Sequence, residues 1–520
     1  MRIGEDRMSW LPSLLNPNAR VRLTTRALTT LLGTSSFAVS EEAYIARHQF
    51  IDFAGAGYRM AGRSIGTDEN MDHLYVLHQP TQNVNSYNVE IWPRVIFYGQ
   101  TGYTPAQDVG PLNCSFEIGA TFAGDVTASP DGRWLAVSDQ EGFGQETLPP
   151  SLYESTWDNM TNRGYVIDLA ASNRSCSPLQ LHNLHAFHGA DAVFSGDSKT
   201  LLFGVPYAGD PPTDTPIWGR TVGQIRRHSL SNEGSWGQAS NIRLFIPEAG
   251  LNQNAGMGKS VVASRDGSVI AVYAESLRIK ESENGGEYVQ TQFGYIPEAN
   301  SRTPNYPTIA IVADDSYQYL SISLDNPEEY HTDGRTGPSG YYTGQQLAIA
   351  DDGKTVVTIY KDLTRDYGGP GPGTKIQTLT SDADGTYTSE TQTVDFRKCI
   401  DPNTDGSQDY PWGDPYDLAL SGDGDRLAVL TMSLNRIGGV CLLTRENNGW
   451  VPLADASRAL SATLTDFSGK KTTAEIIANR DLSRILIHYN NSATQADIEW
   501  SSGANGLPIW LLYEASRAGD

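Results

Sequence analysis

Cysteines are scarce and long apolar runs are missing from this 520-residue chain. No apolar run approaches the roughly 18 residues that a membrane-spanning helix needs, so membrane insertion is not expected. Four cysteines are too few for a disulfide scaffold. Cys114 with Cys176 and Cys399 with Cys441 are two possible pairs, and buried free thiols are the alternative.

Basic residues are also in short supply, because 38 Lys and Arg stand against 61 Asp and Glu, for a net charge of −23. That charge repels phosphate and argues against nucleic acid as a partner. Residues 1–40 are the exception, with five Arg against Glu5 and Asp6. This segment is therefore predicted to be a basic, extended arm that docks onto other structural proteins of an assembly. Its most apolar stretch, Leu28 to Val39, is interrupted by Thr and Ser, so it is a poor signal peptide and no cleavage is expected.

Motifs of common catalytic sites are missing. The sequence contains no Gly-x-Ser-x-Gly and no His-Glu-x-x-His, and Gly256–Ser260 lacks the first glycine of a phosphate-binding loop. A glycosidase-like pair of carboxylates stays open, although spacing alone nominates none. We therefore expect binding rather than catalysis.

One short unit recurs seven times along the chain. The clearest copy is Ser129-Pro-Asp-Gly-Arg-Trp-Leu-Ala-Val137, in which a polar turn leads into an apolar strand. Asp or Asn with Gly suits a tight turn with left-handed backbone, and the β-branched and aliphatic run suits a buried strand. The other copies begin at Asp68, Ser195, Ser264, Ala350, Ser421 and Asn479.

The copies lie 58 to 86 residues apart, which is too long for one hairpin and suits a four-stranded sheet with long loops. The repeats resemble the Ser-Pro-Asp-Gly-x-x-Leu-Ala-Val blades of Tol-type and tryptophan-aspartate-like β-propellers. A strand such as Gly439–Arg445, followed by a polar turn and Trp450–Leu453, is also similar to repeats in tail and fibre proteins of bacterial viruses. The resemblance implies an all-β, seven-bladed β-propeller, a fold that carries enzymes, receptors and scaffolds alike.

The domain prediction is an N-terminal arm over residues 1–40 and one propeller over residues 41–520. The last repeat is short of an outermost strand, and residues 40–53 read as a strand. We expect that segment to close the ring, which would cover an exposed sheet edge.

The long connections are predicted to gather on one face of the propeller. In an up-and-down sheet, the loops between the second and third strands and those between sheets leave at the same end. The longest of these segments are 140–162, 207–224, 276–307, 326–344, 361–373 and 397–416. Function is expected on that face, although long loops are also well tolerated insertions.

Aromatic side chains interleaved with Asp, Asn and Gly are frequent in these connections. They suit a glycan or protein receptor, and the alternative is that each ring packs its own loop onto the propeller. The candidate ligand-binding residues are Trp157, Trp218, Tyr330, Tyr341, Tyr342, Tyr367, Tyr410, Trp412 and Tyr416.

One connection contains a candidate calcium loop. Oxygen-bearing residues alternate along the segment that begins at Asp401, and Gly406 permits a sharp bend. The helix-flanked type of calcium loop has Glu at its twelfth position, whereas this segment has Trp412 there. A metal-free turn is the alternative. The candidate ligands are Asp401, Asn403, Asp405, Ser407 and Asp409.

The sequence therefore predicts a non-enzymatic binding or structural propeller, a component of a virus particle or other extracellular assembly that recognises a host glycan or protein. A propeller enzyme of the lactonase or glycosidase type is one alternative, and an intracellular interaction scaffold in the cytoplasm is another. Carboxylates converging on the propeller axis would favour the enzyme, whereas an apolar channel plug with aromatic side chains on the outer rim would favour the binder.

Overall fold

A computed structural model gives the structure of the protein. It describes residues 43–47, 65–78, 87–97, 100–103, 112–114, 123–139, 163–172, 174, 176–180, 191–205, 224–242, 258, 260–277, 288–291, 294–297, 306–313, 316–321, 343–361, 374–394, 396, 399, 414–433, 436–447, 449–453, 457, 473–490 and 508–516. Residues Ala43–Asp520 form one compact unit. Among the described residues, no helix has the length and apolar character to cross a membrane.

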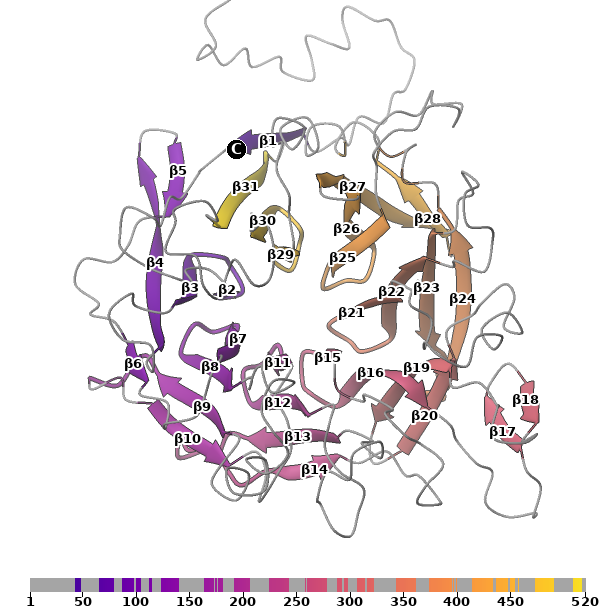
Figure 1. The fold of residues 1–520 in the computed structure, drawn as a ribbon, viewed down its shortest axis with the longest axis horizontal. Helices are drawn as coiled ribbons and strands as arrows, with labels where there is room; N and C mark the ends of the chain where they lie inside the picture. Colours follow the sequence, from indigo (N-terminus) through magenta and orange to yellow (C-terminus); the bar gives the residue numbers. More distant parts are fainter. Residues whose placement is uncertain are drawn as a thin grey trace, which may run out of the picture. The chain divides into compact units, whose positions relative to one another are not determined.

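Seven small antiparallel sheets surround a common axis in this unit (Figure 1). The predicted all-β, seven-bladed β-propeller is therefore confirmed. The strands of the first three sheets, from the innermost outward, are β2 (Ile65–Thr67), β3 (His73–His78), β4 (Tyr87–Phe97) and β5 (Gln100–Tyr103), with β6 (Leu112–Cys114) also paired to β4; β7 (Ala123–Ala128), β8 (Trp134–Asp139), β9 (Arg163–Asp168) and β10 (Cys176–Gln180); and β11 (Asp191–Phe194), β12 (Thr200–Val205), β13 (Gln224–Ser229) and β14 (Ser240–Ile242).

The next three sheets follow the same order, and the fourth carries an inserted hairpin. The strands are β15 (Ser260–Ala263), β16 (Val269–Leu277), β19 (Tyr306–Ala313) and β20 (Ser316–Ser321), with the hairpin β17 (Tyr288–Thr291) and β18 (Gly294–Pro297); β21 (Thr343–Ile349), β22 (Thr355–Lys361), β23 (Thr374–Ser381) and β24 (Tyr387–Thr393); and β25 (Asp414–Leu420), β26 (Arg426–Ser433), β27 (Arg436–Glu446) and β28 (Gly449–Pro452).

The seventh sheet combines the two ends of this unit. Its strands are β29 (Thr473–Ala478), β30 (Arg484–Asn490), β31 (Pro508–Ser516) and β1 (Ala43–Arg47). Strand β1 lies within the segment 40–53 and pairs antiparallel with β31, so the outermost strand comes from before the first sheet.

Each repeated turn joins the two innermost strands of its sheet through a fixed set of hydrogen bonds. The Ser129 hydroxyl donates to Asp131 Oδ1 at 2.5 Å and accepts the Trp134 N–H at 2.8 Å. Asp131 Oδ1 also accepts the Arg133 N–H at 3.0 Å. Gly132 has a φ of +70°, the left-handed backbone that the Asp-Gly pair predicts.

The less regular copies keep this geometry with other atoms. Asn479 Oδ1 replaces the serine hydroxyl and accepts the Arg484 N–H at 2.8 Å. Met71, Ser198 and Leu482 hold the left-handed position without being glycine, with φ between +53° and +63°. Side-chain oxygen acceptors therefore support the turn in most copies. In the copy that begins with Ala350, the backbone bonds from the Ala350 N–H to Thr355 and from the Gly353 N–H to Ala350 keep the same geometry.

Apolar clusters fill the space between consecutive sheets. Between the third and fourth sheets, Leu202 and Ile225 pack with Val272 and Ala310, and all four are fully buried. Between the seventh and first sheets, Leu486 packs against Leu74 and neighbouring side chains. The core is therefore divided among sheet interfaces, as expected for a propeller.

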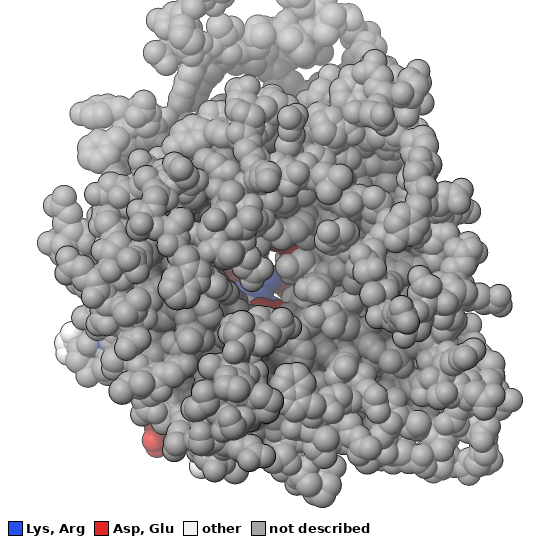
Figure 2. Space-filling model, viewed as in Figure 1, with Lys and Arg blue, Asp and Glu red and all other residues white. Residues whose placement is uncertain are grey.

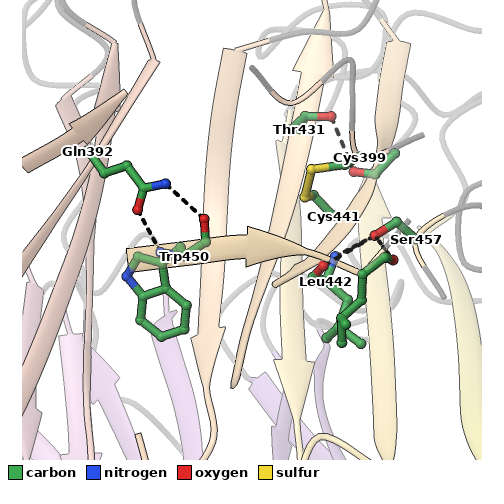
Figure 3. The surroundings of a disulfide bond; sticks show 9 residues. Gln392, Cys399, Thr431, Cys441, Leu442, Trp450 and Ser457 are labelled. Carbon is green, nitrogen blue, oxygen red and sulfur yellow. Dashed lines mark hydrogen bonds between the residues drawn. A yellow bond between two sulfur atoms is a disulfide. The ribbon is translucent and has the colours of Figure 1, made fainter. Parts of the chain in front are cut away.

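A disulfide ties the segment that follows the fifth sheet to the sixth sheet. Cys399 bonds to Cys441 of β27, with Cα atoms 5.5 Å apart, and both residues are buried (Figure 3). Nearby, Gln392 of β24 exchanges two hydrogen bonds, of 2.6 and 2.8 Å, with the main chain of Trp450. One of the two cysteine pairs left open by the sequence is therefore formed. Cys114 with Cys176 stays a prediction.

Candidate functional site

Seven equivalent residues meet where the repeated turns converge on the axis. They hold the second position of each turn: Glu69, Pro130, Gly196, Arg265, Asp351, Gly422 and Arg480. Several are joined by backbone hydrogen bonds from one turn to the next. The Arg265 N–H donates to the Asp351 carbonyl at 2.8 Å, the Asp351 N–H to Gly422 at 2.8 Å, and the Gly422 N–H to Arg480 at 2.7 Å.

Four of these residues form what we call the turn-side quartet: Glu69, Arg265, Asp351 and Arg480. Arg265 lies 2.9 Å from the Glu69 carboxylate and 3.2 Å from that of Asp351. Arg480 lies 3.2 Å from Glu69 and also pairs with Asp351. Two guanidinium groups therefore share two carboxylates, and the quartet has no net formal charge.

Small residues make room for the quartet. A Cβ on Gly196 would collide with the Arg480 guanidinium, and a Cβ on Gly422 would lie 2.8 Å from the Asp351 carboxylate. The long charged side chains can therefore extend across the axis and fill its turn-side end. Acidic and basic atoms are visible inside the central opening in Figure 2.

A second group of charged residues lies further along the innermost strands. Asp191, Asp417 and Glu475 each stand four residues before the first residue of their turn, and we call them the axial carboxyl layer. Four strand steps of about 3.3 Å put this layer about 13 Å from the turns, toward the face with the long connections. Asp125 of β7 holds the same sequence position, but there the pairing with β8 shifts between Ala123 and Val126.

Two of these carboxylates join neighbouring sheets. Asp417 of the sixth sheet accepts the Ile476 N–H of the seventh at 2.8 Å, and its other oxygen accepts the Leu418 N–H at 2.8 Å. Asp191 of the third sheet accepts the Val261 N–H of the fourth at 2.8 Å. The layer thus satisfies backbone donors on the exposed edges of the innermost strands.

The carboxyl layer favours protonated carboxyl groups. Burial raises the pKa of Asp417 well above its usual range, and the charge of Glu475 adds to the shift. Burial raises the pKa of Glu475 to about 7, with a further contribution from Asp191. Because these residues come from the third, sixth and seventh sheets, their charges interact across the axis.

A β-bulge precedes Asp417. The pairing of β25 with β26 shifts between Pro415 and Asp417, which leaves Tyr416 outside the ladder. Bulges redirect side chains and are frequent beside functional sites. The strand begins at Asp414, so the predicted connection 397–416 extended too far and Tyr416 lies in a strand rather than a loop.

Outside the described residues lie the calcium ligands Asp401, Asn403, Asp405, Ser407 and Asp409, and the aromatic residues Trp157, Trp218, Tyr330, Tyr341, Tyr342, Tyr367, Tyr410 and Trp412. In the part of the chain that is described, no group of three or more His, Cys, Asp or Glu is arranged to hold a metal ion.

The quartet and the carboxyl layer were missed from the sequence, although a signal was present. Aligning the copies on their turns puts an acidic residue four positions earlier in four of them: Asp125, Asp191, Asp417 and Glu475. The same alignment puts all four quartet residues at the second position. These two aligned positions could have identified the carboxyl layer and the quartet from the sequence.

No family model matches the sequence, and no curated protein matches it. Solved structures resemble the fold at low identity. An oligogalacturonate lyase in complex with manganese is 11% identical with a TM-score of 0.41, over 92% of this chain and 99% of that one. The β-propeller domain of the Trilobed protease from Pyrococcus furiosus is 10% identical with a TM-score of 0.39, over 89% and 98%. The periplasmic gluconolactonase of Pseudomonas aeruginosa is 13% identical with a TM-score of 0.31, over 75% and 94%.

Proposed function

We propose that the chain binds a polyhydroxylated ligand of the carbohydrate class at the loop-side end of its axis. The observation that carries this proposal is the axial carboxyl layer, in which the pKa of Asp417 lies well above its usual range and that of Glu475 is about 7. A protonated carboxyl group donates a hydrogen bond, whereas an ionised one only accepts. Near neutral pH the layer offers both, which suits ligand hydroxyl groups.

The two ends of the axis also favour entry from one side. The turn-side quartet occupies one end with paired charges. The carboxyl layer lies toward the other end, where the long connections emerge. A ligand that enters from the loop face would meet the carboxyl groups first, with the bulge at Tyr416 beside Asp417.

A glycan array followed by calorimetry on the strongest ligand tests this proposal. We expect Glu475→Ala and Asp417→Ala to weaken binding about tenfold or more, because each variant removes a carboxyl group that would hydrogen-bond ligand hydroxyl groups. Glu390→Ala, which changes an exposed residue of β24, is the matched control. A silent array, or variants that bind as the control does, would contradict the proposal.

A propeller enzyme is the second candidate, and the convergence of carboxyl groups on the axis favours it. A general acid or base works best when its pKa lies near the working pH, and the pKa of Glu475 is about 7. The charge of Asp191 adds to the raised pKa of Glu475, and that of Glu475 to the raised pKa of Asp417, so the three carboxyl groups would act together on a bound glycoside or lactone.

Turnover separates the two candidates. On a panel of glycosides and lactones, an enzyme should lose about 10²- to 10⁴-fold in rate with Glu475→Gln. A binder should show no turnover with any variant. Activity that is unchanged in Glu475→Gln would remove the assigned acid–base role.

A place in a virus particle, anchoring through residues 1–40, and calcium in the loop 401–409 stay predictions, as does a cytoplasmic scaffold. Sedimentation of the full chain with purified particles would test its place in the particle and its anchoring through residues 1–40. A shift in melting temperature on adding calcium would support calcium binding by the loop 401–409. The absence of a shift would favour the metal-free turn.

A further inference from the structure

Strand β1 is a peripheral element of the seventh sheet. It pairs with β31 through five residues, from Ala43 opposite Ser516 to Arg47 opposite Leu512. In the strand order of that sheet β1 stands at the outer edge, whereas β31 is also paired to β30 over seven residues. The described contact that holds β1 is therefore a short backbone ladder.

The interface between the seventh and first sheets is built from other strands. Arg94 of β4 pairs with Glu514 of β31, and Arg484 of β30 lies 3.2 Å from Asp72 of the first turn. Arg484 also lies 3.4 Å from Glu514, so the four residues form one network.

Apolar packing closes the same interface. Leu486 of β30 is buried among side chains of the first sheet, including Ile65 and Trp92. The described residues of this cluster and of the ion-pair network belong to the first sheet and to the inner strands of the seventh. These contacts join the two sheets directly, and β1 pairs along the outer edge of β31.

We propose that the outer edge of β31 is an exchangeable strand-docking site whose second occupant is β1 of another copy of this chain. An exposed strand edge is a template for pairing with an extended segment. The β1 of a second copy has by definition the same sequence and register as the strand seen here. Exchange would thus join copies without any new surface.

The connection between β1 and the first sheet is long enough for exchange. Seventeen residues, 48–64, separate Arg47 from Ile65. Fully extended, they span at most about 56–61 Å. A flexible linker of seventeen residues gives an effective concentration on the order of millimolar, so exchange is expected at high protein concentration or within a dense assembly.

Single cysteines on separate molecules distinguish exchange from pairing within one chain. Full-length Ala43→Cys and Ser516→Cys proteins are mixed at about 1 mM and then oxidised. This concentration is comparable to the effective concentration of β1 within one molecule. We expect a disulfide-linked dimer joining one molecule of each kind, falling about tenfold in yield at 0.1 mM. The parent protein, oxidised in parallel, reports cross-links through its native cysteines.

Two further samples fix the interpretation. Arg47→Cys mixed with Ser516→Cys is out of register and should give no dimer above the parent. The double variant Ala43→Cys/Ser516→Cys at low concentration should cross-link within one molecule. A double variant that cross-links while the mixed samples do not would overturn the proposal. A double variant that does not cross-link would overturn the pairing on which the proposal rests.

Discussion

The two ends of the propeller axis differ in their charged groups: one end has paired basic and acidic side chains, and the other has a layer of acidic side chains. At the turn side, Arg265 and Arg480 are each paired with Glu69 and Asp351, and the charges cancel. About 13 Å further along the strands, the axial carboxyl layer gathers acidic groups, and burial raises the pKa of Asp417 and Glu475. The first arrangement stabilises the ring, whereas the second buries acidic groups at a cost in stability. Removing one charge should therefore have opposite effects at the two ends.

Arg480→Ala should have the largest effect. It leaves the Asp351 and Glu69 carboxylates with Arg265 as their shared partner, and partly buried charges that lose a partner destabilise strongly. We expect a loss of about 3 kcal/mol in the free energy of unfolding, measured in urea. Lys199→Ala is the control, because the Lys199 side chain is 73% exposed and its removal should change stability by less than about 0.5 kcal/mol. Equal losses in the two variants would contradict the role of the quartet.

Glu475→Gln should change stability in the opposite direction above neutral pH. The folded pKa of about 7 lies above the ordinary value of 4.5, so the folded protein binds the proton more tightly than the unfolded chain. The associated stability is complete below pH 4.5 and is lost as the pH rises to 7. Above pH 7 the parent should lose about 2 kcal/mol in its free energy of unfolding, a figure reduced for the partial exposure of the Glu475 side chain. The variant should not show this loss, because glutamine does not ionise. Melting temperatures of both proteins between pH 4 and 8 would test this, and parallel curves would contradict it.

Gly422→Ala should have a smaller effect at the turn side. The added Cβ would lie 2.8–2.9 Å from all three atoms of the Asp351 carboxylate and would push it away from Arg480. Crowding of this kind costs about 1–2 kcal/mol. Gly449→Ala is the matched control, since its nearest atom would be 3.5 Å away. If the two substitutions cost the same, the quartet does not depend on small neighbours.

Salt should give the smallest effect. At 1 M the Debye length is about 3 Å, which weakens interactions of partly exposed charges. The difference between the parent and Arg480→Ala should shrink by about 0.5–1 kcal/mol at 1 M sodium chloride. A difference that grows with salt would mean that packing rather than charge carries the effect of Arg480.

The fold could be predicted from the sequence because its signal is local and repeated. Asp131 and Gly132 set the turn within four residues, and the apolar run Trp134–Val137 forms the next strand, as predicted. The strand from residues 40–53 could be suggested because the last repeat lacked an outer strand. In each case the information lies within one repeat or in a count of repeats.

The candidate site could not be predicted in the same way. The partner of Asp417 is the backbone of Ile476, 59 residues later, and the pairs of Arg480 lie in the first and fifth sheets. These contacts depend on how sheets are placed around the axis. Tyr416 shows the same limit, because the predicted connection 397–416 includes it, whereas strand β25 begins at Asp414.

The most direct test of the account is the titration of Glu475 in the folded protein. Infrared difference spectra between the parent and Glu475→Gln, recorded from pH 4 to 9, would follow the carbonyl band of its protonated carboxyl group. The account predicts that this band disappears with a midpoint near pH 7. A midpoint near 4.5, the ordinary value for glutamate, would show that the two ends of the axis do not differ as described.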